Sequence, residues 1–114
     1  MVVGINALNQ TDRLAISEFC TLIRHKLGEN LKQLRLFGSK VRGDDDPESD
    51  IDILVLLEKR DTEMDNVIID LAYDISLKFD VVIIPVVLTA EEYFSSLSKA
   101  TLFYYNTRNE GVAL

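Results

Sequence analysis

Residues 37–57 bring together side chains that could do metal and phosphate chemistry, in the sequence FGSKVRGDDDPESDIDILVLL. Asp50 and Asp52 stand two residues apart at the start of an apolar run, and side chains two apart on a strand point to the same side. Neighbouring carboxylates repel each other, which raises a pKa unless a cation lies between them. The pair therefore predicts oxygen ligands for a divalent cation, most naturally Mg²⁺. The alternative is a strand that starts at the surface and becomes buried further along.

Gly38 and Ser39 form a turn upstream of this pair that could bind phosphate. A glycine lets the backbone approach a phosphate closely, and neighbouring N–H groups and the Ser39 hydroxyl can donate to phosphate oxygens. Arg42 can reach the same oxygens with its planar guanidinium. When the Gly-Ser pair is considered by itself, a plain surface loop is the alternative.

Asp80 lies between Phe79 and the apolar run Val81–Ile84, where an acidic residue is out of character unless it faces a site. Three carboxylates on neighbouring strands could hold two metal ions about 4 Å apart, the arrangement used for in-line phosphoryl transfer. An aspartate before a strand can also be a turn residue, so Asp80 adds to the Asp50–Asp52 pair without identifying a site by itself.

The elements that must position these residues alternate between helix and strand. Capping residues and apolar residues at helical spacing predict helices over residues 9–28, 62–78 and 89–111. Runs rich in β-forming residues predict strands over 31–37, 51–57 and 79–88, with a loop over 38–49. Pro85 lacks an N–H donor, so the third strand is expected at an edge or with a bulge. This order predicts an α/β fold, a small mixed β-sheet with helices packed on it.

Composition narrows the class of protein. The 114 residues suffice for one domain over residues 1–114, and 47% of them are apolar. Nineteen acidic residues against twelve basic ones give a net charge of −7, which argues against direct nucleic-acid binding. A single cysteine excludes an internal disulfide, and with a single histidine it excludes the usual zinc sites. The longest apolar run is too short to span a membrane, and no secretory signal is evident, so we expect a cytoplasmic protein.

Several other residues have ordinary interpretations. We expect Cys20 in the core, because it adjoins the apolar stripe of the first helix, and His25 in solvent. Tyr73 and Asp74 are expected to be exposed or interfacial. The apolar and aromatic residues 102–105 favour core packing over docking on a partner.

The spacing of Gly38-Ser39, ten residues and Asp50-Ile51-Asp52 resembles the G-S-x10-D-x-D signature of minimal nucleotidyltransferases in the DNA polymerase beta-like superfamily. The fuller form GSxxRGxxxxxSDIDxxV is matched as well, and Asp80 in FDVVI matches the third carboxylate of that superfamily. The further positions that match the fuller form are Arg42, Gly43, Ser49 and Val55.

The resemblance implies a polymerase-beta-like fold and transfer of AMP from ATP, with diphosphate as the leaving group. By analogy, Gly38 and Ser39 would hold the triphosphate, with Arg42 nearby. Asp50 and Asp52 would bind two Mg²⁺ ions. Asp80 would join the ion on the nucleophile side and help to deprotonate the acceptor hydroxyl.

The resemblance also implies a partner. Minimal forms of this kind are similar to the antitoxin of MNT–HEPN toxin–antitoxin pairs, a prokaryotic type VII-like system in which the antitoxin adenylylates a tyrosine of the HEPN ribonuclease toxin in a hetero-oligomer. Two alternatives stay open. One is an antitoxin that neutralises its partner by binding alone, and the other is a nucleotidyltransferase acting on a small molecule.

Overall fold

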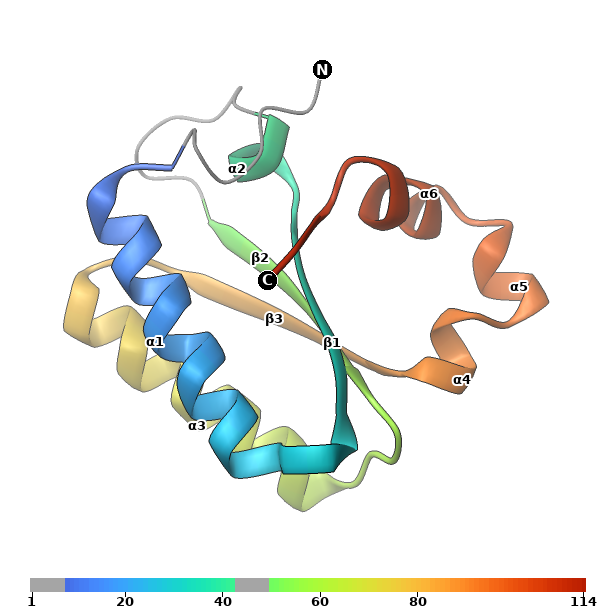
Figure 1. Ribbon diagram of the computed structural model, residues 1–114, viewed down its shortest axis with the longest axis horizontal. Coiled ribbons are helices and arrows are strands. Elements are labelled where there is room, and N and C mark those ends of the chain that lie inside the picture. Colours follow the sequence, from blue (N-terminus) through green and yellow to red (C-terminus); the bar gives the residue numbers. More distant parts are fainter. Residues whose placement is uncertain (1–7, 43–49) are drawn as a thin grey trace.

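The computed structural model describes residues 8–42 and 50–114, which form a central sheet with helices on both faces (Figure 1). Its elements follow in chain order: α1 (Gln10–Leu27), the 3-10 helix η2 (Gly28–Asn30), β1 (Leu31–Phe37), α2 (Ser39–Arg42), β2 (Ile51–Leu57), α3 (Thr62–Phe79), β3 (Ile83–Thr89), α4 (Ala90–Tyr93), α5 (Ser96–Lys99), α6 (Leu102–Asn109) and β4 (Val112–Ala113). The α/β fold and mixed sheet expected from the sequence are confirmed. Among the described helices, none is long and apolar enough to cross a membrane.

The four strands lie in the order β3-β2-β1-β4. β1 pairs antiparallel with both β2 and β4, whereas β2 and β3 are parallel. A parallel pair needs a crossover connection, and α3 provides it between β2 and β3. β1 and β2 each have a strand on both sides. β2 also has its side chains buried on both faces, apart from the half-buried Asp52.

The two faces of the sheet carry different cores. α1 and α3 run side by side over one face (Figure 1), where they cover Ile51, Ile53 and Val55 of β2. On the other face, Leu54 and Leu56 pack with Tyr93 and with side chains from the α4–α6 segment. Asp52 alternates with Ile51 and Ile53, so it lies on the α4–α6 face, as does Asp50.

The helix ends follow local capping chemistry. The Asn9 side chain accepts from the backbone N–H of Asp12 at 2.7 Å and begins α1. α3 begins one residue earlier than a Thr62 cap would place it, because the Asp61 side chain accepts from the N–H of Met64. The expected Thr89–Glu92 capping box is confirmed. The segment after it is not one helix but three short ones, because Ser95 and Thr101 each cap a new start.

The third strand also begins later than the sequence predicts. α3 continues to Phe79, and Asp80 ends it in the left-handed conformation at φ 54° and ψ 49°. Its backbone N–H bonds to the carbonyl of Ser76, a standard way to satisfy the last turn of a helix. β3 therefore starts at Ile83 rather than near Asp80. Its place at the edge of the sheet, expected from Pro85, is confirmed.

Candidate active site

β2 begins at the end of the sheet where α2 also lies (Figure 1). Asp50 and Asp52 lie at this start of the strand. Asp50 is exposed and Asp52 is half-buried. Asp52 pairs with Phe37 of β1 on one side and with Ile84 of β3 on the other. Because paired residues in a sheet point to the same face, an aromatic and an aliphatic side chain flank this carboxylate.

Gly38 holds the turn after β1 against Asp52. Its φ of 84° is a conformation that residues with a side chain rarely adopt. A Cβ atom at this position would also overlap with the Oδ2 oxygen of Asp52. Two independent constraints thus require glycine here. The backbone of the predicted phosphate-binding turn and the carboxylate of the predicted metal ligand are in direct contact.

The short helix α2 starts directly after this glycine. The carbonyl of Gly38 accepts from the backbone N–H groups of Val41 and Arg42, at 3.2 and 3.3 Å. Ser39 is the first residue of α2 and is partly exposed. Ser39 directly follows Gly38, whose backbone contacts Asp52, so the two residues lie at the same end of the sheet.

Charges around Asp52 favour a bound cation. Burial raises the pKa of the Asp52 carboxyl, the neighbouring Asp50 charge raises it further, and Arg42 partly opposes the shift. A divalent cation between the two carboxylates would relieve both their desolvation and their repulsion. The chemistry of these donors therefore fits Mg²⁺, which prefers carboxylate oxygens and substrate phosphates.

Arg42 lies at the exposed end of α2, with one guanidinium nitrogen 3.8 Å from a carboxylate oxygen of Glu110. Its charge also acts on Asp52. The structure thus brings Arg42 to the site, as the sequence predicts, and adds Glu110 from the end of α6 as its neighbour.

Asp80 is not part of this carboxylate group. Across residues 8–42 and 50–114, no three His, Cys, Asp or Glu side chains form a group that could hold a metal ion. The reason is the longer α3, which makes Asp80 its cap and turns it toward a groove lined by Tyr73 and Leu77. On β3, the residue level with Asp52 is Ile84. The third carboxylate expected at Asp80 is therefore not beside the other two, and its catalytic role stays a prediction.

Some expected positions fall outside the described residues. These are Gly43 and Ser49 of the fuller motif and the acidic residues of the loop between them.

Asp12 and Lys40 were missed by sequence reasoning. The Lys40 Nζ atom lies 3.1 Å from an Asp12 carboxylate oxygen, and both side chains are almost fully buried. This ion pair links α2, which follows Gly38, to the first turn of α1. A lysine inside a Gly-Ser-Lys turn and an aspartate early in a helix carry no local signal of pairing, because the contact depends on how α1 crosses the sheet.

Cys20, His25, Tyr73 and Asp74 lie as expected, whereas the core packing expected of residues 102–105 holds for only part of that segment. Cys20 is buried, and its burial raises the pKa of the thiol. His25, Tyr73 and Asp74 are exposed. In the C-terminal segment, Phe103 and Tyr104 pack around Tyr93, whose hydroxyl bonds to the Thr107 hydroxyl. Leu102 and Tyr105 of the same segment are exposed.

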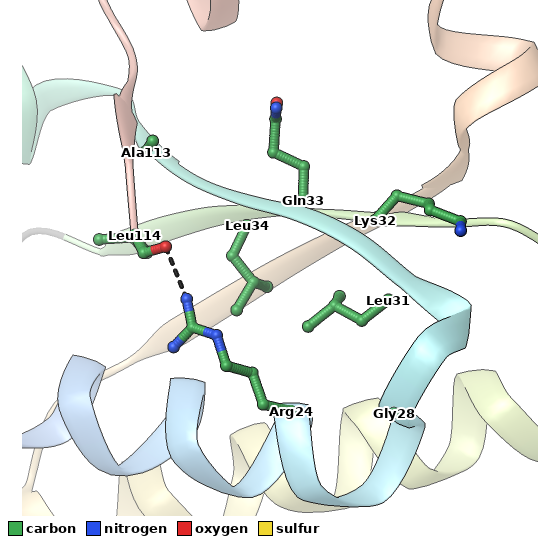
Figure 2. Close-up of a pocket in the computed structure, with 8 residues that line it drawn as sticks. All are labelled: Arg24, Gly28, Leu31, Lys32, Gln33, Leu34, Ala113 and Leu114. Carbon is green, nitrogen blue, oxygen red and sulfur yellow. Dashed lines mark hydrogen bonds between the residues drawn. The ribbon is translucent and has the colours of Figure 1, made fainter.

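A hollow of about 470 Å³ lies at the opposite end of β1 from Gly38 (Figure 2). Arg24 crosses it and donates to the carbonyl oxygen of Leu114 at 2.6 Å. Leu31, Leu34 and Lys32 line its floor and rim. Because β1 separates this hollow from Asp50 and Asp52, it does not belong to the candidate active site.

Comparisons with known proteins find two relatives named as protein adenylyltransferases. The chain is 40% identical over 100 residues to "Putative protein adenylyltransferase MJ0604" of Methanocaldococcus jannaschii, with 88% of this chain and 94% of that protein covered. It is 41% identical over 73 residues to "Putative protein adenylyltransferase MJ0141" of the same organism, covering 63% of this chain and 74% of that protein.

Solved structures share the fold at lower identity. A crystal structure of a toxin–antitoxin with AMP-PNP superposes with a TM-score of 0.58 at 23% identity, covering 84% of this chain and 69% of that one. A crystal structure of the toxin–antitoxin MntA-HepT gives a TM-score of 0.53 at 20% identity, covering 89% and 69%. The family described as "Polymerase beta, Nucleotidyltransferase" matches residues 21–109, which include the Gly38–Ser39 turn and both strand carboxylates. The chain belongs to the polymerase beta nucleotidyltransferase family.

Proposed function

We propose that this protein is a Mg²⁺-dependent protein adenylyltransferase, the antitoxin of a type VII-like pair in the prokaryotic cytoplasm. Its acceptor would be a tyrosine of a HEPN-family ribonuclease toxin, which the transfer of AMP neutralises. The observation that carries the proposal is the contact between Gly38 and the Asp52 carboxylate, beside Asp50. The contact supports the proposal because a nucleotidyltransferase needs a turn that could bind phosphate beside carboxylates that could bind metal.

The proposed reaction is an in-line displacement. The acceptor oxygen forms a bond to the α-phosphorus of ATP, the bond from that phosphorus to the diphosphate oxygen breaks, and the acceptor proton leaves to a base or to solvent. Asp50 and Asp52 would hold Mg²⁺, which supplies positive charge to the phosphate oxygens.

The chain's own residues orient the nucleotide. The bare backbone at Gly38 gives the phosphates room beside Asp52, and the Ser39 hydroxyl can donate to a phosphate oxygen. Arg42, already close enough to influence Asp52, can stabilise negative charge on the phosphates. Transfer of positioned groups in this way depends on orientation and electrostatic stabilisation more than on covalent chemistry by the protein.

The partner is proposed from two findings. The two relatives named above carry the name of protein adenylyltransferases, and the superposed structures are toxin–antitoxin complexes. A protein acceptor that brings its own surface to the site is consistent with both facts.

The experiment that tests this function is intact mass measurement of the HEPN-family partner after incubation with this protein, ATP and Mg²⁺. We expect the partner to gain one or more AMP units. Asp52→Asn should abolish the gain, whereas Glu91→Gln should preserve it, because Glu91 is exposed on α4 away from the site. If a stable complex forms and no mass is gained, the protein neutralises its partner by binding alone.

A further inference from the structure

A groove of about 510 Å³ lies between α3 and the edge strand β3. Ile69, Tyr73 and Leu77 line it from α3, and Val82 and Pro85 line it from the strand side. Asp80 lies at the end where α3 turns toward β3, a turn that Figure 1 shows at the left of the molecule.

The groove leaves large apolar side chains in water. Ile69, Tyr73 and Leu77 recur every four residues and are 55%, 64% and 66% exposed. They form a stripe separate from the face of α3 that packs on the sheet through Ile68, Ala72 and Ile75. A contiguous exposed apolar stripe of this kind is unfavourable in a free protein and is typical of an interaction surface.

The charges around this stripe are acidic. Asp70 and Asp74 follow Ile69 and Tyr73 on the solvent side of α3, and Asp80 lies within the groove. Lys78 points elsewhere, with its Nζ atom 2.8 Å from Glu18 of α1. A matching surface must therefore combine apolar side chains with lysine or arginine. A second copy of this chain would oppose like charges across the contact, which disfavours self-association through this face.

One end of the groove lies beside the start of β2, across the edge strand from the candidate active site. The carbonyl of Val82 accepts from the backbone N–H of Ile51 at 2.8 Å, so Val82 lies directly beside the start of β2 and next to Asp50. Ile84, 38% exposed, pairs with Asp52 and so points to the same face of the sheet as that carboxylate, opposite α3. The groove and the two carboxylates therefore lie on either side of the edge strand β3. A protein seated in the groove and passing around this strand would have its neighbouring residues within reach of the two carboxylates.

We infer that the α3–β3 groove binds the acceptor protein, through a segment whose apolar side chains are flanked by lysine or arginine. This inference rests on the proposed function and adds to it the surface that recognises the acceptor. Apolar side chains from the partner fill the stripe, and its basic residues face Asp70, Asp74 and Asp80. Charged rims of this kind speed association and select partners.

The test compares Leu77→Glu with Leu97→Glu. Both leucines are exposed, Leu97 by 83%, and Leu97 lies on α5 outside the groove. Affinity for the HEPN-family partner is measured by calorimetry, and affinity for ATP by titration of the chain alone. We expect Leu77→Glu to weaken partner binding at least tenfold without changing ATP affinity, and Leu97→Glu to change neither. The pair Asp70→Lys and Asp74→Lys should also weaken partner binding.

The outcomes separate this inference from the proposed function. Partner binding by Leu77→Glu at wild-type affinity overturns the groove assignment and leaves AMP transfer untouched. A wild type that binds but transfers nothing contradicts the proposed function, while loss of binding in Leu77→Glu still supports the groove. A wild type without any complex, or a dimer that Leu77→Glu dissociates, overturns the inference. If Leu77→Glu does not fold, Tyr73→Ser tests the same stripe.

Discussion

The carboxyl group of Asp52 is half-buried and close to the charge of Asp50, and both effects raise its pKa. Its ionised form, which would bind a cation, is therefore less favourable than that of an exposed aspartate in the protein without metal. We expect Asp52→Asn to lower AMP transfer by at least about a hundredfold, and to raise the melting temperature measured in EDTA. Differential scanning fluorimetry with the mass assay measures both. A lower melting temperature would mean that the carboxylate stabilises the fold.

Substitution of Gly38 tests its effect on both AMP transfer and the stability of the fold. Gly38→Ala forces a Cβ into the Asp52 carboxylate and strains a left-handed backbone, so we expect it to abolish transfer and cost at least about 1 kcal/mol of stability. Gly28→Ala is the matched control, because Gly28 also has a positive φ, of 53°, with no atom in the way of a Cβ. It should lose about 1 kcal/mol while retaining transfer. Equal activity in both variants would contradict the role given to Gly38.

For Asp80, the role as a metal ligand predicted from the sequence differs from its position as the cap of α3 in the structure. Asparagine tolerates the left-handed conformation that Asp80 adopts as the cap of α3, so Asp80→Asn should fold normally. Because Asp80 does not join the other two carboxylates, we expect AMP transfer within about tenfold of wild type. A hundredfold loss in kcat, equal to that of Asp52→Asn, would restore Asp80 as the third metal ligand predicted from the sequence.

At the scale of the elements, α2 is positioned by the buried Asp12–Lys40 ion pair. Removing one partner of such a pair costs about 3–5 kcal/mol, whereas replacing both with apolar residues of similar size is often neutral. We therefore expect Asp12→Ala to destabilise strongly and the double change Asp12→Leu with Lys40→Met to fold normally. If the pair positions the Gly38–Ser39 turn, the folded double variant should bind ATP at least tenfold more weakly. Unchanged ATP affinity would make the pair purely structural.

The start of α4 provides a pH-dependent test. Hydrogen bonds from the backbone and side chain of Thr89 lower the pKa of Glu92. A lowered pKa in the folded state adds stability above the ordinary glutamate pKa, and this contribution is lost as the pH falls through the lowered value. The stability difference between wild type and Glu92→Gln should therefore be present at pH 7 and disappear in acid. Denaturant unfolding at several pH values measures it, and a constant difference would contradict the capping role.

At the scale of the whole molecule, local signals in the sequence predicted what depends on local structure. The α/β order, the edge position of β3 and the shared face of Asp50 and Asp52 follow from caps, β-forming runs and strand alternation. The position of Asp80 could not be predicted in this way. Whether a residue after an apolar stripe begins a strand or ends a helix depends on how far α3 extends over the sheet.

Contacts between distant segments were equally beyond the sequence. The Asp12–Lys40 pair joins α1 to α2, and the groove lies between α3 and β3, so both depend on how the helices pack against the sheet. Tyr93 is similar, since its burial follows from three short helices folding back over β2 rather than from one continuous helix. The arrangement of packed layers, and not any local pattern, sets these features.

The candidate site itself comes from the antiparallel hairpin of β1 and β2, with Gly38 at the end of one strand and Asp52 at the start of the other. Gly38 and Asp52 are only 14 positions apart in the sequence, so their contact closes a short loop and is expected to form early among the long-range contacts of the fold. The groove depends on α3 and β3, which must also be in place. The candidate active-site residues can therefore come together before the groove forms. The same β1–β2 unit could also serve in domains whose surfaces recognise quite different acceptors.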